Sequence, residues 1–222
     1  MLRTQGLKNT LKFIQEEQAG KAIVPSQAVP LFFVKFSKVI GFLRRSIEAG
    51  AQLSVVDQYI LGTDATFFVV DFFTGNRASD LGRTRSSDLK FTLTKTFRGG
   101  KSCPFVLEPF KNNEVCPVSW TKYYLSVCHF LSIELAGGYI FRTTDRRKVV
   151  PSRPFLGSAV NNRLRRHTGA KIDCGDTPHS FRHGLSKTLN MMGCSPDEIS
   201  RYVGWRNGDI CLLYTSPSPR DA

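Results

Sequence analysis

Two short segments in the last third of the chain carry the residues with the clearest chemical potential. Residues 179–182 read HSFR, and Gly204 and Trp205 follow about twenty residues later. His179 and Arg182 are three residues apart, so on a helix their side chains share one face. Arginine supplies a permanent charge and a planar fork of N–H donors, which suit the oxygens of a phosphate group. Taken alone, the pair also fits an ordinary surface beside a helix N-terminus, and Trp205 fits a core aromatic residue.

Three further residues could take part in chemistry, and each also has an ordinary explanation. Arg77 follows an apolar segment, and its spacing to Asp80 would allow a surface salt bridge across one helical turn. Lys95 is one of several lysines in a segment of strand-like composition. Tyr214 has a hydroxyl group that could act as a nucleophile, or it is an ordinary tyrosine near the chain end. Their order distinguishes the set: Arg77, Lys95, His179, Arg182, Trp205 and Tyr214.

This order resembles the catalytic domain of the tyrosine recombinase (phage integrase) family, which carries Arg, Lys, His-x-x-Arg, His or Trp, and Tyr. The resemblance covers roughly residues 25–210. Residues 178–184, PHSFRHG, are similar to the family's helix-opening motif, and residues 202–205, YVGW, to its LGH or GGW motif. Residues 75–82, GNRASDLG, and 93–101, LTKTFRGGK, are closest in character to recombinases of eukaryotic mobile elements such as cryptons and DIRS-like retroelements.

The resemblance implies DNA strand cleavage and rejoining, as in site-specific recombination or integration, through a 3′-phosphotyrosyl intermediate and without metal, ATP or another cofactor. It implies that Arg77 and Arg182 clamp the scissile phosphate, with His179 and the indole N–H of Trp205 as further donors. A lysine at a hairpin tip would protonate the leaving 5′-oxygen. We assign Lys95 to this role, with Lys101 as the rival because the gap between Arg77 and Lys95 is short for the family. The implied partners are double-stranded DNA and further copies of the chain assembled on it.

The charge of the chain also points to a polyanion. Lysine and arginine number 31 against 18 acidic residues, for a net charge of +13 and a pI near 9.7. Nucleic acid is therefore expected before a membrane surface. Residues 142–171 hold nine basic residues and one acidic residue, and either phosphate contacts or a solvated surface would explain them. The residues expected to contact DNA are Lys101, Arg146, Arg147, Lys148, Arg163, Arg165 and Arg166.

Cysteine usage and hydropathy indicate an intracellular protein. The six cysteines form no C-x-x-C pair and no zinc-finger spacing, so free thiols in a reducing compartment are expected rather than disulfides or a metal site. The apolar stretches are too short and too charged to cross a membrane. A eukaryotic copy acting on DNA would work in the nucleus.

Hydrophobic periodicity and turn residues predict the elements that must position these side chains. Pro178 suits the first turn of a helix, and Ser195 with Glu198 predicts a capping box. Two strand-like runs, 90–98 and 102–110, flank Gly99 and Gly100 and predict a β-hairpin. Helices are predicted at about 7–19, 31–49, 55–73, 77–84, 118–135, 155–168, 178–192 and 196–203. The predicted fold class is mixed α+β and mainly α-helical: the tyrosine recombinase catalytic-domain fold with a small antiparallel hairpin.

The chain divides into three parts on this interpretation. Residues 1–24 are expected to be a fragment of an N-terminal core-binding domain or a linker, and residues 25–210 the catalytic domain. Residues 211–221, CLLYTSPSPRD, match the translation of a transposase-based sequencing-library adapter, so 211–222 is expected to be non-native. Pro217 and Pro219 prevent a helix there, whereas the resemblance implies that the nucleophilic tyrosine lies on one. The native tyrosine is therefore expected to be missing, with Tyr214 in its place by coincidence.

Three alternatives remain open at this point. A catalytically inactive, domesticated protein could keep the recombinase fold and bind DNA. A type IB topoisomerase would use related residues to relax DNA. A helical protein that does not bind nucleic acid would owe its motifs to chance.

Overall fold

The computed structural model describes residues 30–50, 53–88, 92–96, 102–145, 148–168 and 177–205. For 92–96 and 102–106 it describes the backbone alone. The predicted helix at 7–19 and the tail that contains Tyr214 lie outside these residues.

Helices make up most of the described chain, as predicted. They are α2 (Phe33–Glu48), α3 (Val55–Thr74), α4 (Ala78–Gly82), α5 (Pro117–Phe130), α6 (Gly157–Thr168), α7 (Pro178–Met191) and α8 (Pro196–Val203), with a 3₁₀ turn at Ser86–Asp88. Together with two small antiparallel sheets, they confirm the mainly helical α+β class. None of the helices in the described segments is long and apolar enough to cross a membrane.

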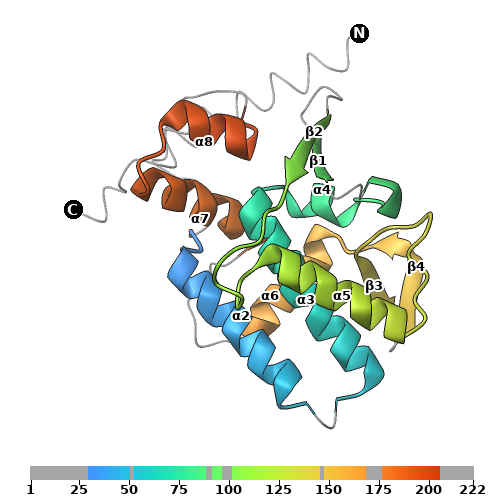
Figure 1. The fold of residues 1–222 in the computed structure, drawn as a ribbon. Helices are drawn as coiled ribbons and strands as arrows, with labels where there is room; N and C mark the ends of the chain where they lie inside the picture. The colour runs from blue at the N-terminus through green and yellow to red at the C-terminus, as the bar shows by residue number, and fades with distance from the viewer. Residues whose placement is uncertain are drawn as a thin grey trace, which may run out of the picture.

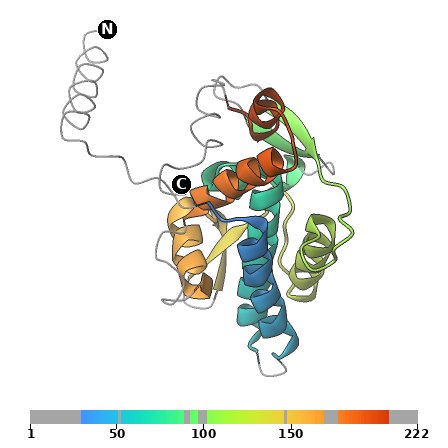
Figure 2. The ribbon, with the colours of Figure 1, turned by 90° about the vertical axis from the view of Figure 1, so that its left-hand side faces the viewer.

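Helix α3 is the centre of the fold, with α2, α5, α6 and α7 packed around it (Figures 1 and 2). It is apolar on all sides and mostly buried, which is typical of a core helix. Ser54 caps its N-terminus by accepting a hydrogen bond from the backbone N–H of Asp57. Aromatic rings fill the space around it: Phe36 stacks on Phe72 with centroids 4.2 Å apart, and Phe68 stacks on Phe181 at 5.3 Å.

Helix α5 ends five residues before the predicted boundary at residue 135. Leu131 is its C-cap residue, and Ser132 has a positive φ of 54°. That left-handed residue turns the chain so that the N–H of Ile133 bonds back to the carbonyl of Cys128 at 2.8 Å. The apolar residues that follow belong to a loop packed on the core rather than to another helical turn.

Two antiparallel strand pairs complete the fold. The pair β1 (Thr92–Thr96) and β2 (Ser102–Val106) confirms the predicted hairpin and sets Lys95 opposite Cys103. The pair β3 (Arg142–Asp145) and β4 (Lys148–Pro154) was not predicted. Its strands are short, and their only aliphatic residues, Val149 and Val150, are adjacent, so the sequence lacks the apolar alternation that identifies a half-buried strand.

Candidate active site

Arg77 lies at the junction between α3 and α4. Gly75 ends α3 in the left-handed conformation, with φ of 56°, and a Cβ atom there would also press against Leu185. Two residues later, Arg77 is the N-cap residue of α4. Its half-exposed side chain lies 3.8 Å from the carboxylate of Asp80, a long surface pair that contributes little to stability. The guanidinium group is therefore held near the end of α3 and still accessible.

Arg182 is built into the same junction from α7. Pro178 and a capping box between Thr177 and Ser180 start that helix, as expected for a first-turn proline. One turn later, the side chain of Arg182 is 3% exposed, and its Nη1 donates to the carbonyl of Gly75 at 2.6 Å. This bond joins residues 107 positions apart and fixes the guanidinium beside the Arg77 turn.

Trp205 reaches Arg182 from the end of α8. The predicted capping box of Ser195 and Glu198 starts α8, and Gly204 ends it with φ of 74°. The N–H of Trp205 then bonds to the carbonyl of Ser200 at 2.9 Å. The guanidinium carbon of Arg182 lies 5.6 Å from the centroid of the Trp205 ring, within range of a cation–π interaction.

His179 completes the cluster on the first turn of α7. Its pKa is lowered from the ordinary value, first by burial and then by the positive charges of Arg182 and Arg77. Both arginines therefore lie close enough to act on the same imidazole. At neutral pH the ring is uncharged and can donate or accept a hydrogen bond according to its tautomer.

The shared field of the two arginines gives a first prediction. Replacing Arg77 with glutamine removes one positive charge from beside His179, so the pKa of His179 should rise toward its ordinary value. An NMR titration of the imidazole resonances, assigned with a His179→Gln variant, measures the shift. Arg44→Gln is the matched control, since Arg44 is an exposed arginine on α2 whose partner is Glu48. An unchanged pKa of His179 in Arg77→Gln would show that the charge of Arg77 does not act on the imidazole.

The other predicted catalytic residues are placed only in part. Lys95 lies in β1, where the backbone alone is described. Lys101 and Tyr214 are outside the described residues, so the choice between the two lysines stays a prediction. Figures 1 and 2 place the β1–β2 hairpin at the same end of the molecule as α4, α7 and α8.

The predicted DNA-binding residues fall into two groups. Lys148, Arg165 and Arg166 are exposed on β4 and α6, as a phosphate contact requires. Arg163 is instead turned inward, with a side chain only 13% exposed. Arg146 and Arg147 lie outside the described residues.

The inward position of Arg163 is explained by Asp64, which is fully buried in α3. Nη1 of Arg163 lies 2.9 Å from Oδ1 of Asp64, and Nε2 of His167 lies 2.7 Å from Oδ2. Nη2 of Arg163 donates to the hydroxyl of Thr144 at 3.1 Å. This geometry favours a structural role for Arg163, joining α3, α6 and β3. An acidic residue within an apolar run was the sequence signal that Asp64 needs a basic partner.

Tyr202 is a residue near the cluster to which sequence reasoning gave no role of its own. Its hydroxyl donates to the carbonyl of Phe73 at 2.8 Å, and burial raises its pKa to about 12. The bond ties α8, which Trp205 follows, to the last turn of α3, which Arg77 follows. We find no local sequence signal for this contact, because it joins residues 129 positions apart.

Known proteins share the sequence pattern and the fold of this chain. Residues 61–220 match the model of the phage integrase family. No curated protein sequence matches the chain at a significant level.

Solved structures share the fold at low sequence identity. XerA recombinase is 18% identical with a TM-score of 0.60, over 90% of this chain and 63% of the XerA chain. XerH recombinase bound to its difH substrate is 13% identical with a TM-score of 0.60, over 85% of this chain and 50% of XerH. A lambda integrase dimer bound to a core site is 16% identical with a TM-score of 0.52, over 88% of this chain and 51% of the integrase.

The chain spans between half and two thirds of the length of these structures. The match to the family model covers well over half of the chain, and it includes the segments that carry Arg77, His179, Arg182 and Trp205. The chain belongs to the phage integrase family, the tyrosine recombinases.

Proposed function

We propose that this protein cuts and rejoins DNA strands, with Arg77, His179, Arg182 and Trp205 holding the scissile phosphate. The observation that carries the proposal is the convergence of these side chains from three distant segments. Arg77 and Arg182 both act on the pKa of His179, and Arg182 lies against the Trp205 ring. Two guanidinium groups at one junction suit an anion, because their forked donors match the oxygens of a phosphodiester.

The proposed reaction is a transesterification. A tyrosine hydroxyl attacks the phosphorus, a 3′-phosphotyrosyl bond forms, and the bond to the 5′-oxygen breaks. The tyrosine loses a proton and the leaving 5′-oxygen gains one, for which we propose Lys95 as the donor and Lys101 as the alternative. The step balances without a cofactor. Donors fixed around the developing charge contribute about 3–4 kcal/mol each in enzymes.

The identity of the nucleophile is a separate part of the proposal. Tyr214 lies nine residues after Trp205, within the segment that matches the family model. It also lies within the eleven residues that match a sequencing adapter, and we propose that the native nucleophile is a different tyrosine encoded beyond Ile210. Tyr202 is a poor candidate, because its hydroxyl donates to Phe73 and its pKa is raised to about 12.

The proposed partners are double-stranded DNA and other copies of this chain on the same DNA. XerH in complex with difH and the lambda integrase dimer on its core site are structural relatives in which DNA is bound. The net charge of +13 supports a polyanionic partner. From the motif character of residues 75–82 and 93–101, we further propose a eukaryotic mobile element as the source and the nucleus as the site of action.

A covalent trapping experiment tests the enzymatic proposal. A pool of nicked suicide duplexes with random sequence removes the need to know the target site. The chain with its genomic codons beyond Ile210 should form a DNA adduct that survives denaturing electrophoresis, and the chain with residues 211–222 should form little or none. Replacing the restored tyrosine with phenylalanine should abolish the adduct. If the restored, folded chain binds duplexes and forms no adduct, the protein is a DNA-binding member of the family without catalytic activity.

Duplex binding at several salt concentrations distinguishes both the enzyme and the inactive DNA-binding protein from a protein that does not bind nucleic acid. Affinity should fall steeply as salt rises, because each phosphate contact releases condensed counterions. Absence of duplex binding at low salt would reject the proposed partner as well as the proposed reaction.

A further inference from the structure

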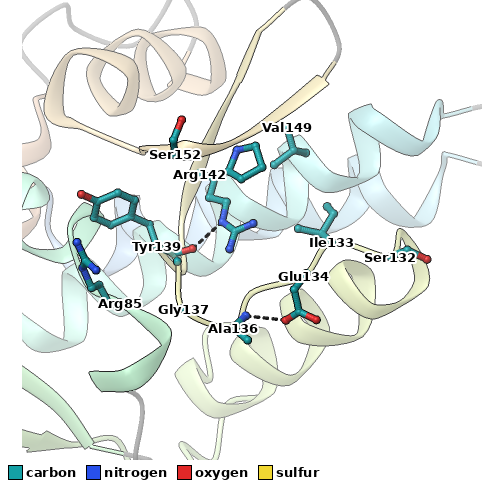
Figure 3. Close-up of a pocket in the computed structure, with 12 residues that line it drawn as sticks. Arg85, Ser132, Ile133, Glu134, Ala136, Gly137, Tyr139, Arg142, Val149 and Ser152 are labelled. Carbon is teal, nitrogen blue, oxygen red and sulfur yellow. Dashed lines mark hydrogen bonds between the residues drawn. The ribbon is translucent and has the colours of Figure 1, made fainter.

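A cavity of about 840 Å³ lies beside the β3–β4 hairpin (Figure 3), and none of Arg77, His179, Arg182 and Trp205 lines it. Its walls are the loop between α5 and β3, the strand β4, and the residue Arg85 that follows α4. The reaction proposed above makes no use of this cavity. Two arginines and one carboxylate, Glu134, are the charged groups that line it.

Arg142 is the central feature of this cavity. It is 3% exposed, and its Nε donates to the carbonyl of Tyr139 at 2.8 Å. The guanidinium lies against Gly138 so closely that a Cβ atom there would meet Nη2 at 2.5 Å. Figure 3 shows the group directed into the cavity from the start of β3. Its position is therefore fixed by the backbone around it.

The two outer nitrogens of Arg142 are available to a ligand. Among the described residues, neither Nη1 nor Nη2 has a hydrogen-bond acceptor, and no carboxylate lies within ion-pair distance. The carboxylate of Glu134 instead accepts a hydrogen bond from the N–H of Ala136 at 2.7 Å. A nearly buried arginine is stabilised when an anion pairs with it, and its forked geometry favours a phosphate or carboxylate.

A second guanidinium lies across the cavity. Arg85 is placed over the ring of Tyr139, with its guanidinium carbon 5.5 Å from the ring centroid. The backbone there is pinned by two hydrogen bonds of 3.0 Å, from Ser86 to Gly138 and from Ile140 to Thr84. Arg85 and Arg142 thus hold two positive charges against the single negative charge of Glu134.

We propose that this cavity binds a phosphate group, and that the group is a backbone phosphate of the same DNA duplex, remote from the scissile one. This rests on the proposed function for the source of the phosphate. Arg85 follows Arg77 by eight residues, through the five-residue helix α4. Their Cα atoms are therefore at most about 25 Å apart. Each strand of B-DNA carries a phosphate about every 3.4 Å along the axis, so one duplex can occupy both sites.

The first arm of the test uses duplexes in which single phosphates are replaced by neutral methylphosphonates. For the full chain, one replacement remote from the cleavage position should weaken binding about tenfold. Arg85→Gln and Arg142→Lys should weaken binding to the normal duplex. In these variants, the same methylphosphonate replacement should cause almost no further loss of affinity. Glu134→Gln should strengthen binding, since Glu134 is the only acidic residue among the described residues that line the cavity. Arg44→Gln is the matched control and should leave the pattern of replacements unchanged.

The second arm uses inorganic phosphate alone and follows the N–H resonances of residues 134–142 by NMR. Wild type should respond, and Arg142→Lys should respond at several-fold higher concentration; its melting temperature reports whether it remains folded. If the protein binds phosphate through Arg142 but does not bind duplex DNA, the phosphate site is supported. Its assignment to DNA and the proposed function are then both wrong. The inference would be overturned by two results together. The chain would bind the duplex, but no methylphosphonate replacement would have an effect that changes in the Arg85, Arg142 or Glu134 variants, and inorganic phosphate would shift no resonance.

Discussion

Replacing Arg182 with lysine should slow covalent adduct formation on a nicked duplex by about 10²–10³-fold, in the chain that carries its genomic codons beyond Ile210. The guanidinium of Arg182 is nearly buried and held by Gly75, so it would meet the proposed phosphate without reorganisation. Losing one such preorganised donor raises the barrier by about 3–4 kcal/mol in enzymes of known mechanism. Lysine keeps the charge, but it cannot bond Gly75 and a phosphate oxygen with the same rigid fork.

Single-turnover rates at saturating protein separate this effect from weaker DNA binding. Arg44→Lys is the matched control, because Arg44 is exposed on α2 and its pair with Glu48 lies far along the chain from the cluster. Its rate should stay within about twofold of wild type, since it makes no contact with the proposed phosphate site. A melting temperature for Arg182→Lys reports the loss of the bond to Gly75 independently. A rate close to wild type in a folded Arg182→Lys would remove Arg182 from the proposed phosphate clamp.

Replacing Asp64 with asparagine should lower the free energy of unfolding by about 3–5 kcal/mol. Asp64 is fully buried, and its two oxygens face Arg163 and His167 at 2.9 and 2.7 Å. Without the carboxylate, the charge of Arg163 stays in a site where its side chain is only 13% exposed. The loss is large because the remaining charge is left without its partner, not because the pair itself is strongly favourable.

Urea denaturation measures the change, and the chain offers a matched control. Glu48→Gln removes a carboxylate from an exposed i,i+4 pair with Arg44 and should change stability by less than about 0.5 kcal/mol. Arg163→Met in the Asp64→Asn background should restore part of the loss, because it removes the unpaired charge. A similar small change in both acid-to-amide variants would show that Asp64 and Arg163 do not form the buried pair.

Much of the framework around the candidate site could be predicted from short-range signals. The order of Arg77, His179, Arg182 and Trp205 pointed to the family, and Pro178 with the Ser195–Glu198 box marked the starts of α7 and α8. Capping and turn formation act over three or four residues, so they can be read locally. The early end of α5 and the β3–β4 pair were missed for the complementary reason. A single left-handed serine and a four-residue strand without apolar side chains leave no periodic pattern.

The sequence by itself determined the family, the helical class and the order of the candidate site residues. Only the tertiary structure decided the environment of each arginine. Arg182 is anchored by a carbonyl 107 residues away, Arg163 by a carboxylate 99 residues away, and Arg142 lines a cavity. Identical guanidinium groups differ here in exposure and partner, because burial and pairing depend on which distant segments pack together. The spacing of residues along the chain does not predict that packing.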